Sequence, residues 1–400
     1  MAVSAPPMAL TLLSLASRQI WPQVLAVLHA RPERLVLFHS DEEGESKRPA
    51  ERLRDFFQAG GTGHAPVVEL RRMPHDRFRD VVDAFADAAE QWSLDDTNCR
   101  VHLTGGNKLM AMAAAEWCRL AGVPCFYLER DLRVFPFLPQ GSDLLPQSDF
   151  KLDPHLPRDL APLALLRCQL DGADIAHAGQ RLTLNAAGRR LPEAELQPLL
   201  RNDHDFRKFL DWDVAEPDQQ AGFGLEYAAA FALLKLGVPS VQRSIRLAPR
   251  VLRGSGKEEG ELDLVFNWAG KLWVVDCKDR RSAENKVDQL RTEILRQLTP
   301  DVRLMELLKR LEEELRQRDL HPLKEDLLSV AEVGGLLGRA IVVRRTPLPQ
   351  QAEEFARSRR IEVVFKDRLL SGLRPILFPD EPASLEQLRA LAAARTRAQP

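Results

Sequence analysis

The sequence lacks most of the features that mark secreted, membrane-bound or zinc-stabilised proteins. Its five cysteines are sparse and odd in number, and no two form a Cys-x-x-Cys pair, so neither a disulfide framework nor a structural zinc site is indicated. No apolar run approaches the ~20 residues that a membrane-spanning helix needs. The first residues lack a basic segment followed by an apolar one with a small-residue cleavage site. We therefore expect a reduced, cytoplasmic protein without a membrane partner.

Two nucleotide-binding motifs are also missing, and the overall charge is close to neutral. Neither a P-loop nor a Gly-x-Gly-x-x-Gly fingerprint is present, so ATP or NAD is not indicated. The net charge is −2, and a nucleic-acid partner must therefore be sought in local basic patches. With 400 residues, of which 44% are hydrophobic, the chain is long enough for two or three domains with cores of their own.

Strands and helices alternate through the first third of the chain. This alternation predicts an α/β domain with a mainly parallel, doubly wound sheet, in which ligands bind at the carboxyl ends of the strands. Strands are expected at 9–15, 35–40, 66–70, 100–104 and 124–129, and helices at 18–29, 46–58, 76–92 and 107–121.

The turn at 103–108 is the most informative part of this domain. Its two glycines allow the backbone to approach a phosphate, the following helix offers free N–H groups, and a lysine adds positive charge. Three further polar residues end the first two strands or follow them, and would flank the same crevice. A tight turn with a solvated lysine, beside helix caps and surface polar residues, is the alternative. The expected ligand-binding residues are Ser14, Gln19, Ser40, Thr104, Gly105, Gly106, Asn107 and Lys108.

A second candidate site lies in a predicted β-hairpin. Its strands are Glu261–Phe266 and Leu272–Lys278, and its turn is centred on Ala269 and Gly270. With a loop of two or four residues, this register places Asp263 directly opposite Asp276. Since side chains alternate along a strand, Lys278 shares the face of Asp276. A register shift of one residue would destroy this arrangement.

The opposed carboxylates point to a divalent cation. Like charges facing each other across a hairpin repel, and burying either one unpaired costs roughly several kcal/mol. Mg²⁺ or Mn²⁺ would relieve both problems, because such ions prefer carboxylate oxygens, and Lys278 could then hold or activate a water. Glu226, near the start of the apolar helix 223–234, is a third acid. A solvent-facing strand pair, with Glu226 as a helix-dipole partner, is the alternative.

Basic residues flank this hairpin in the sequence. Such patches suit a phosphate backbone, although a single charge run is also typical of a solvated surface. The residues are Arg243, Arg246, Arg250, Arg253 and Lys257 before the hairpin, and Lys278, Arg280, Arg281 and Lys286 at and after its end.

The order helix, strand, hairpin and Asp-x-Lys resembles the PD-(D/E)xK nuclease superfamily. The matching residues are Glu226, Asp263, Asp276 and Lys278, although Leu262 stands where the family often has proline. The resemblance implies that the two aspartates bind the metal, that the lysine assists the attacking water, and that the helical glutamate supports the site. On this reading the Cys277 carbonyl joins Asp263 and Asp276 as a metal ligand.

The sequence Thr104–Lys108 followed by an Ala- and Met-rich helix resembles the CRISPR-associated Rossmann-fold (CARF) sensor domain. That family forms homodimers and binds cyclic oligoadenylate across the two-fold axis. A CARF-like domain ahead of a PD-(D/E)xK-like domain is similar to the CRISPR ancillary nucleases of type III systems. The combined resemblance implies a nuclease of DNA or RNA, dependent on Mn²⁺ or Mg²⁺ and activated by cyclic tetra-adenylate.

The predicted domains are a sensor at 1–145, a connector at 146–205, a nuclease at 206–378 and a C-terminal helix and tail at 379–400. The sensor and connector meet in a Pro- and Asp-rich join at 135–160. Further expected elements are helices at 162–169, 193–210, 282–298, 301–317, 350–359 and 383–395, a possible hairpin at 175–184, and strands at 241–247, 340–344 and 361–365.

Three other functions are compatible with these residues. A non-catalytic sensor would bind the cyclic nucleotide without needing a metal. A restriction-type nuclease would cleave without an effector. A self-limiting enzyme would also degrade its own messenger in the first domain. The sequence leaves open the choice between DNA and RNA, between nicking and double-strand breakage, and the ring size of the effector.

Overall fold

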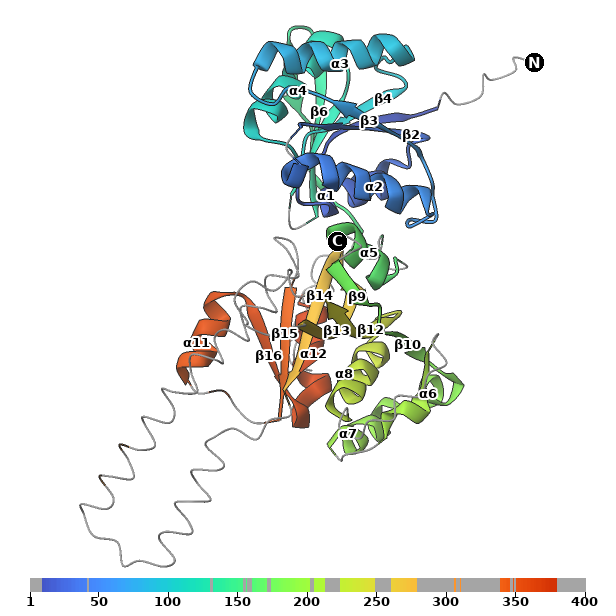
Figure 1. Cartoon of the computed structure of the whole chain (residues 1–400), viewed down its shortest axis with the longest axis vertical. Coiled ribbons are helices and arrows are strands. Elements are labelled where there is room, and N and C mark those ends of the chain that lie inside the picture. The colour runs from blue at the N-terminus through green and yellow to red at the C-terminus, as the bar shows by residue number, and fades with distance from the viewer. Residues whose placement is uncertain are drawn as a thin grey trace, which may run out of the picture.

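The structure is a computed structural model of the chain. It describes residues 9–379 except 42, 130–131, 154–155, 157–159, 171–173, 202–204, 213–223, 249–259, 279–305, 307–309, 311–338, 346–347 and 349. The predicted helices at 282–298, 301–317 and 383–395 therefore lie outside the described residues, apart from two isolated positions. Two lobes, each built on an eight-stranded sheet, are stacked along the long axis of the molecule (Figure 1).

The first lobe is a doubly wound sheet. Five strands run parallel in the order β3-β2-β1-β4-β5, as the alternating pattern predicted. Helices α1 and α2 pack on one face, and helices α3 and α4 pack on the other. The strands are β1 (Thr11–Leu15), β2 (Arg34–His39), β3 (Val67–Arg72), β4 (Cys99–His102) and β5 (Cys125–Leu128), and the helices are α1 (Trp21–Ala30), a π-helical turn (Glu43–Lys47), α2 (Arg48–Gln58), α3 (Phe78–Trp92) and α4 (Lys108–Ala121).

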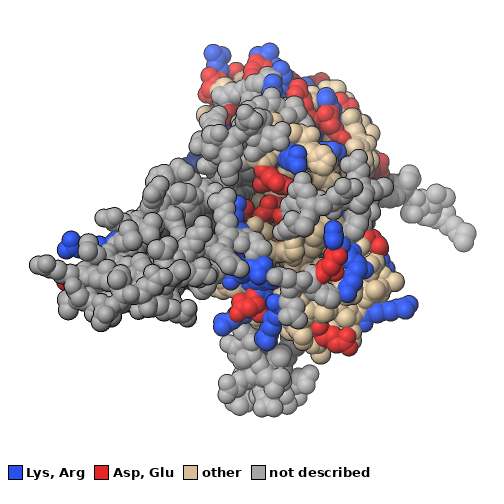
Figure 2. Space-filling view, turned by 60° about the horizontal axis from the view of Figure 1, so that its bottom comes forward, with Lys and Arg blue, Asp and Glu red and all other residues tan. Residues whose placement is uncertain are grey.

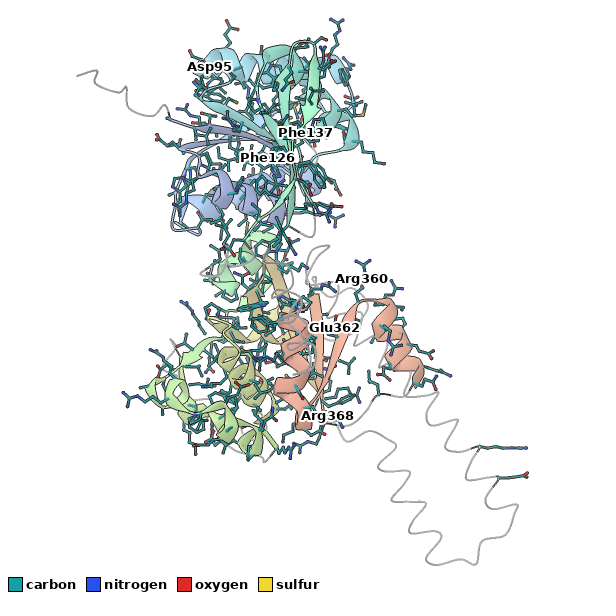
Figure 3. The ribbon with its side chains drawn as sticks, turned by 180° about the vertical axis from the view of Figure 1, so that it is seen from behind. Asp95, Phe126, Phe137, Arg360, Glu362 and Arg368 are labelled. Atoms are coloured by element: carbon teal, nitrogen blue, oxygen red, sulfur yellow. The ribbon has the colours of Figure 1, made fainter. Side chains whose placement is uncertain are left out.

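The predicted proline-rich join at 135–160 is wrong over its first part, because three antiparallel strands extend the first sheet there. They are β6 (Arg133–Gln140), β7 (Asp143–Pro146) and β8 (Phe150–Lys151). Phe137 of β6 pairs with β5 one position from Phe126, and both are marked in Figure 3. Proline removes a ladder donor, yet sheet edges tolerate it, and the short strands β7 and β8 cover β6 only in part.

The second lobe is a mixed sheet. Its strand order is β11-β10-β12-β13-β14-β15-β16, with β9 also pairing with β12, and β14, β15 and β16 run parallel. Helices α8 and α12 cover one face, where they share a core with the sheet. The strands are β9 (Ile175–His177), β10 (Gln180–Leu184), β11 (Leu210–Trp212), β12 (Val241–Leu247), β13 (Gly260–Trp268), β14 (Lys271–Lys278), β15 (Arg339–Arg344) and β16 (Ile361–Phe365), and the helices are α6 (Ala186–Arg190), α7 (Glu193–Arg201), α8 (Gly224–Lys235), α11 (Gln350–Ser358) and α12 (Leu369–Leu377).

Three local predictions in this lobe need correction. The hairpin at 175–184 does not form, because β9 and β10 both pair with β12 rather than with each other. Helix α7 ends at Arg201 instead of 210, and a 3₁₀ turn, Phe206–Phe209, leads into β11. Helix α12 was not predicted, although its apolar side packs against α8; Pro375 inside it disguises the helical pattern.

Helix α5 (Pro162–Gln169) joins the two lobes, and it begins and ends as predicted. It lies between them in Figure 1. Leu165 and Leu166 are fully buried, in a core that is continuous from α2 of the first lobe to β13 and β14 of the second. The Arg52 Nε of α2 donates a 2.9 Å hydrogen bond to the Cys168 carbonyl at the end of α5. The connector is therefore packed against both lobes.

Within the part of the chain that is described, no helix is both long and apolar enough to cross a bilayer.

Candidate functional site

The β13–β14 hairpin has the predicted register. Cα pairs run without interruption from Trp268 and Lys271 at the turn to Leu264 and Val275. Ala269 and Gly270 both have positive φ, 50° and 68°, which is the backbone of the two-residue turns that fit the twist of a hairpin. The pairing ends there, one step before Asp263 and Asp276, whose charges act on each other.

The backbone is irregular where Asp263 leaves the hairpin. On the neighbouring strand β12, the pairing with β13 skips Ser244, which has a φ of 53°. A positive φ is unusual for serine, and such strain concentrates at functional sites. On one side of this point Leu264 packs with α8, and on the other Leu262 packs in the core shared with α5. Strand β13 therefore changes face at Asp263, which re-aims its carboxylate.

Asp263 is held by a hydrogen bond, and its surroundings disfavour its ionised form. Its Oδ2 accepts a 2.5 Å hydrogen bond from the Cys277 backbone N–H. Burial, and after it the nearby charge of Asp276, raise the pKa of Asp263 to about 7. The Lys278 Nζ lies 2.9 Å from the Asp276 Oδ1, so one cation partly offsets two carboxylates. The Cys277 thiol is itself buried, which raises its pKa, and we assign it no nucleophilic role.

Glu226 adjoins this pair from helix α8. Its Oε2 accepts a 2.8 Å hydrogen bond from the Arg243 Nε. Burial raises the pKa of Glu226 to about 8, with the charge of Asp263 as the next cause. The structure thus brings the predicted residues Glu226, Asp263, Asp276 and Lys278 into one electrostatic group. The charge of Asp263 acts on Glu226, and the charge of Asp276 acts on Asp263, so Asp263 is the middle member of the group.

The donor set suits a divalent cation through two side chains rather than three. Among the residues that the structure describes, no group of three or more His, Cys, Asp and Glu side chains could hold a metal ion. The half-buried Asp263 and the buried Asp276 nevertheless offer mutually repelling carboxylate oxygens, the chemistry that Mg²⁺ and Mn²⁺ prefer. Mg²⁺ commonly uses one or two carboxylates and keeps several waters, so the residues present fit such an ion.

The predicted basic patch is only partly available to a ligand. Arg243 is 1% exposed, so it cannot contact a phosphate backbone as predicted, whereas Arg246 on the same strand is exposed. The residues Arg250, Arg253, Lys257, Arg280, Arg281 and Lys286 lie outside the described residues. On the face shown in Figure 2, acidic side chains line a recess and basic side chains lie along part of its rim.

The predicted ligand-binding turn of the first lobe is held against the neighbouring strand β5. The Thr104 Oγ1 donates to the Leu128 carbonyl at 3.0 Å and accepts from the Leu128 N–H at 2.6 Å. Gly105 has a φ of 143°, and a Cβ there would lie 2.1 Å from the Leu15 carbonyl oxygen. No other residue fits this position without moving β1. The turn is thus shaped before any ligand arrives.

The start of helix α4 has a built cap. The Asn107 Oδ1 accepts from the Met110 N–H at 2.9 Å, and its Nδ2 donates to the His75 carbonyl at 2.8 Å. Lys108 is exposed at the first helical position, beside Gly106 with a φ of 59°. The helix therefore starts at exposed residues with a lysine among them, the kind of helix N-terminus to which anions bind.

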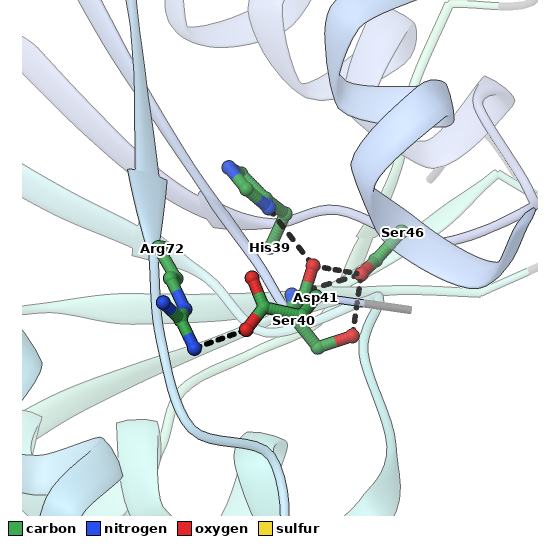
Figure 4. A network of polar contacts seen from close by, with 5 residues as sticks. All are labelled: His39, Ser40, Asp41, Ser46 and Arg72. Carbon is green, nitrogen blue, oxygen red and sulfur yellow. Dashed lines mark hydrogen bonds and ion pairs between the residues drawn. The ribbon is translucent and has the colours of Figure 1, made fainter. Parts of the chain in front are cut away.

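The two predicted serines of the first lobe serve the fold. Ser14 is the penultimate residue of β1, is fully buried, and shares a 2.9 Å hydrogen bond with the His102 Nδ1. Burial lowers the pKa of His102 to about 3, so this ring is neutral. Ser40 is buried against Ser46, with the two Oγ atoms 2.8 Å apart (Figure 4). Gln19 is half-buried in the loop after β1.

The network in Figure 4 shows how the end of β2 is fixed. The Ser40 N–H donates to the Ser46 Oγ at 2.8 Å, and the His39 Nδ1 lies 2.9 Å from the Ser40 carbonyl. Asp41 forms an ion pair with Arg72 of β3. These contacts tie two strand ends to the turn before α2.

Gln23 is a residue of this site that was not predicted. It is fully buried in α1, and its Nε2 donates to the Leu15 carbonyl at 2.7 Å and to the Thr104 carbonyl at 3.2 Å. It therefore connects the ends of β1 and β4 beneath the turn. In the sequence, Gln23 stands out as a single glutamine within the apolar stretch 21–28, which could have marked it as a buried polar residue with a specific partner.

The arrangement of the two lobes matches that of several solved structures. Can2 from Sulfobacillus thermosulfidooxidans in complex with cyclic tetra-adenylate aligns with a TM-score of 0.54 and 16% identity, over 91% of this chain and 95% of that chain. Protein VC1899 from Vibrio cholerae aligns with a TM-score of 0.54 and 14% identity, over 92% and 97%.

A type III CRISPR defence DNA nuclease activated by cyclic oligoadenylate aligns with a TM-score of 0.51 and 22% identity. The alignment covers 87% of this chain and 48% of that one, so this chain spans about half of its length. No protein-family model and no curated protein matches the sequence. At these identities the likeness is one of fold, and at that level the resemblance predicted from the sequence is confirmed.

Proposed function

We propose that this protein is a metal-dependent nuclease of type III CRISPR defence, activated by cyclic tetra-adenylate. The observation that carries the proposal is the pair Asp263 and Asp276, whose charges repel each other, with Lys278 paired to Asp276. The fold shared with Can2 in complex with cyclic tetra-adenylate supports the link to that effector. The DNA nuclease activated by cyclic oligoadenylate supports phosphodiester hydrolysis as the reaction.

The residues of the second lobe divide the work of hydrolysis. Asp263 and Asp276, with the Cys277 carbonyl, would hold Mg²⁺ or Mn²⁺. Such an ion, when bound, polarises a phosphate and lowers the pKa of a water. The hydrogen bond from the Cys277 N–H fixes the Asp263 carboxylate. The Lys278 ammonium positions the attacking water or offsets negative charge on the phosphate, and Glu226 orients the group from α8.

The first lobe would bind the effector at the turn Thr104–Lys108. Its outward N–H groups, together with Lys108, offer positive potential to phosphates. Ser14 and Ser40 support this edge of the sheet from within rather than as direct contacts, since both are buried and hydrogen-bonded. Gln19 is the remaining predicted contact, at the rim.

We further propose that the protein is a homodimer through the first lobe. Helix α4 starts at the effector turn and exposes two large apolar side chains, Met112 at 66% and Leu120 at 62%. They are eight positions apart and so lie on one side of the helix. A second copy packed there would bring two effector turns together, as a ring with repeated units requires. Leu120→Asp should convert the dimer to monomer in light scattering; an unchanged mass would exclude this face.

Effector binding must favour one arrangement of the protein over another to change its activity. Helix α5 is the proposed connector, because it contacts α2 in the first lobe and β12, β13 and β14 in the second. It packs against the hairpin that presents Asp263 and Asp276.

One experiment tests the function as a whole. The protein is incubated with supercoiled plasmid, single-stranded DNA or RNA, with Mn²⁺ or EDTA, and with or without cyclic tetra-adenylate. We expect cleavage only with both the metal and the cyclic nucleotide. Effector binding without cleavage would identify a non-catalytic sensor, and cleavage independent of the effector would identify a restriction-type nuclease.

A further inference from the structure

Arg243 is the largest fully buried side chain among the described residues. Three residues on two elements, α8 and β10, hold its guanidinium. The Nε donates to the Glu226 Oε2 of α8 at 2.8 Å, and NH1 donates to the Gln180 Oε1 of β10 at 3.3 Å. The guanidinium carbon lies 4.4 Å from the centre of the Tyr227 ring, within the range of a cation–π contact.

Stability alone does not account for this residue. Desolvating a charge is costly, and a well-packed hydrophobic residue of similar volume often replaces a buried ion pair without loss. What the ion pair provides is direction, because the planar guanidinium has a fixed set of donors. It fixes one carboxylate oxygen of Glu226, and thereby the orientation of the other.

The position of Arg243 in the sheet connects it to the acids. Arg243 pairs with Leu264, the neighbour of Asp263, and precedes Ser244 with its positive φ. On one side of this irregularity, the Arg243 side chain contacts Glu226 and Tyr227 of α8; on the other, Ile245 packs in the core shared with α5. The reversal that re-aims Asp263 also turns Arg243 toward Glu226.

We propose that Arg243 is a positioning residue, which holds Glu226 against the Asp263–Asp276 pair. This inference rests on the proposed function, because the acids are the proposed catalytic group. Arg243 acts only through Glu226, and its burial excludes a direct contact with the nucleic acid. Gln180 and Tyr227 fix the guanidinium, so the proposal extends the site to β10.

The test is a double-mutant cycle on the full-length protein. Arg243→Met, Glu226→Gln and the double variant are compared in Mn²⁺ affinity by calorimetry, and in single-turnover cleavage with saturating Mn²⁺ and cyclic tetra-adenylate. We expect each single change to weaken Mn²⁺ binding and slow cleavage by about tenfold, as for residues that orient metal ligands. The double variant should be no worse than Glu226→Gln alone. Additive losses, or an unaffected Arg243→Met protein, would overturn the proposal.

Two further variants guard against trivial outcomes. Arg243→Lys keeps the charge but not the fork of donors, and should fold even if Arg243→Met does not. With Glu226 present, we expect Arg243→Lys to lower Mn²⁺ affinity and the cleavage rate less than Arg243→Met does. In the Glu226→Gln protein, the same change should have no further effect. Equal losses with and without Glu226 would show that Arg243 has a merely structural role. Arg339→Met is the matched control, since Arg339, the first residue of β15, forms an ion pair in the same sheet with Glu362, which is labelled in Figure 3.

The cycle also separates the two proposals. If Mn²⁺ binding shows the coupling while the wild-type protein cleaves no nucleic acid, the nuclease function fails and the positioning role stands. If the wild type cleaves and the losses of the two single variants are additive, the nuclease function stands and the positioning role of Arg243 fails.

Discussion

The two candidate sites of this molecule are built on opposite electrostatic principles. The turn of the first lobe is held by neutral hydrogen bonds, from Thr104 to Leu128 and from Gln23 to two carbonyls. The hairpin of the second lobe instead sets two buried carboxylates against each other. The hydrogen bonds of the first site form without its ligand, whereas the carboxylates of the second site, here called the stressed site, repel each other until a cation binds. The comparison indicates a preformed receptor for an anion joined to a site that awaits a metal.

The largest expected effect comes from removing the charges of the stressed site. Asp276→Ala and Lys278→Ala should each lower the cleavage rate by about 10²–10³-fold, the usual cost of losing one electrostatic contact to a transition state. Asp263→Asn should do the same while leaving the melting temperature unchanged or higher, because it relieves repulsion. Single-turnover cleavage and calorimetry measure both quantities. A variant with wild-type turnover would remove that residue from the site.

The preformed turn should instead fail through its shape. Gly105→Ala places a methyl group against the Leu15 carbonyl and forces a strained φ, so we expect cyclic tetra-adenylate binding to be lost and the protein to be destabilised by at least about 1–3 kcal/mol. Gly122→Ala is the control, since its φ of 73° is also positive but nothing lies within 4 Å. Equal binding by both variants would show that close packing is not what the turn needs.

The stressed site also predicts an unusual pH dependence. Burial raises the pKa of Glu226 to about 8 and that of Asp263 to about 7, above their ordinary values near about 4. The folded protein therefore binds more protons than the unfolded chain between about pH 4 and 8, and its stability falls as the pH rises through that range. In EDTA, the melting temperature should drop from pH 5 to pH 8.

Mn²⁺ should reverse this loss at pH 8, because it favours the ionised carboxylates. Asp263→Asn should flatten the pH profile in EDTA. A melting temperature that rises with pH in EDTA would contradict the raised pKa values.

The smallest effect is expected where the two sites communicate. Arg52→Met removes the 2.9 Å hydrogen bond to the end of α5 but touches neither site. We expect unchanged effector affinity and a severalfold smaller stimulation of cleavage by the effector, in keeping with couplings of about 1–3 kcal/mol. Arg54→Met, on the same helix and paired only locally with Asp55, serves as the control. Equal stimulation in the two variants would separate this contact from regulation.

Local sequence patterns predicted most of the fold, because most helices and strands form where their own residues favour them. Helix α5 and strands β12 and β16 have the predicted bounds. The turn at Ala269 and Gly270 fixed the hairpin register, which ends one step before Asp263 and Asp276. The predictions failed where partners are distant in sequence. Nothing near Ile175 or Gln180 shows that both strands pair with β12.

The candidate sites show the same limit. Arg243 read as part of a basic surface patch, yet it is buried, because helix α8 and strand β12 meet only in the folded lobe. Ser14 was predicted from its place near a strand end, but its partner His102 is 88 positions away. Charge opposition within one hairpin could be predicted from the sequence, whereas the contacts that orient those charges could not. The domain boundaries and the roles of individual site residues stay predictions.

The core that runs from Phe57 through Leu165 to Leu272 has a consequence for how the protein melts. Two lobes that share buried side chains lose them together, so heating should give one cooperative transition rather than two. A first lobe expressed alone would expose the apolar side of α2 that packs against α5, and it would aggregate unless α5 is kept with it.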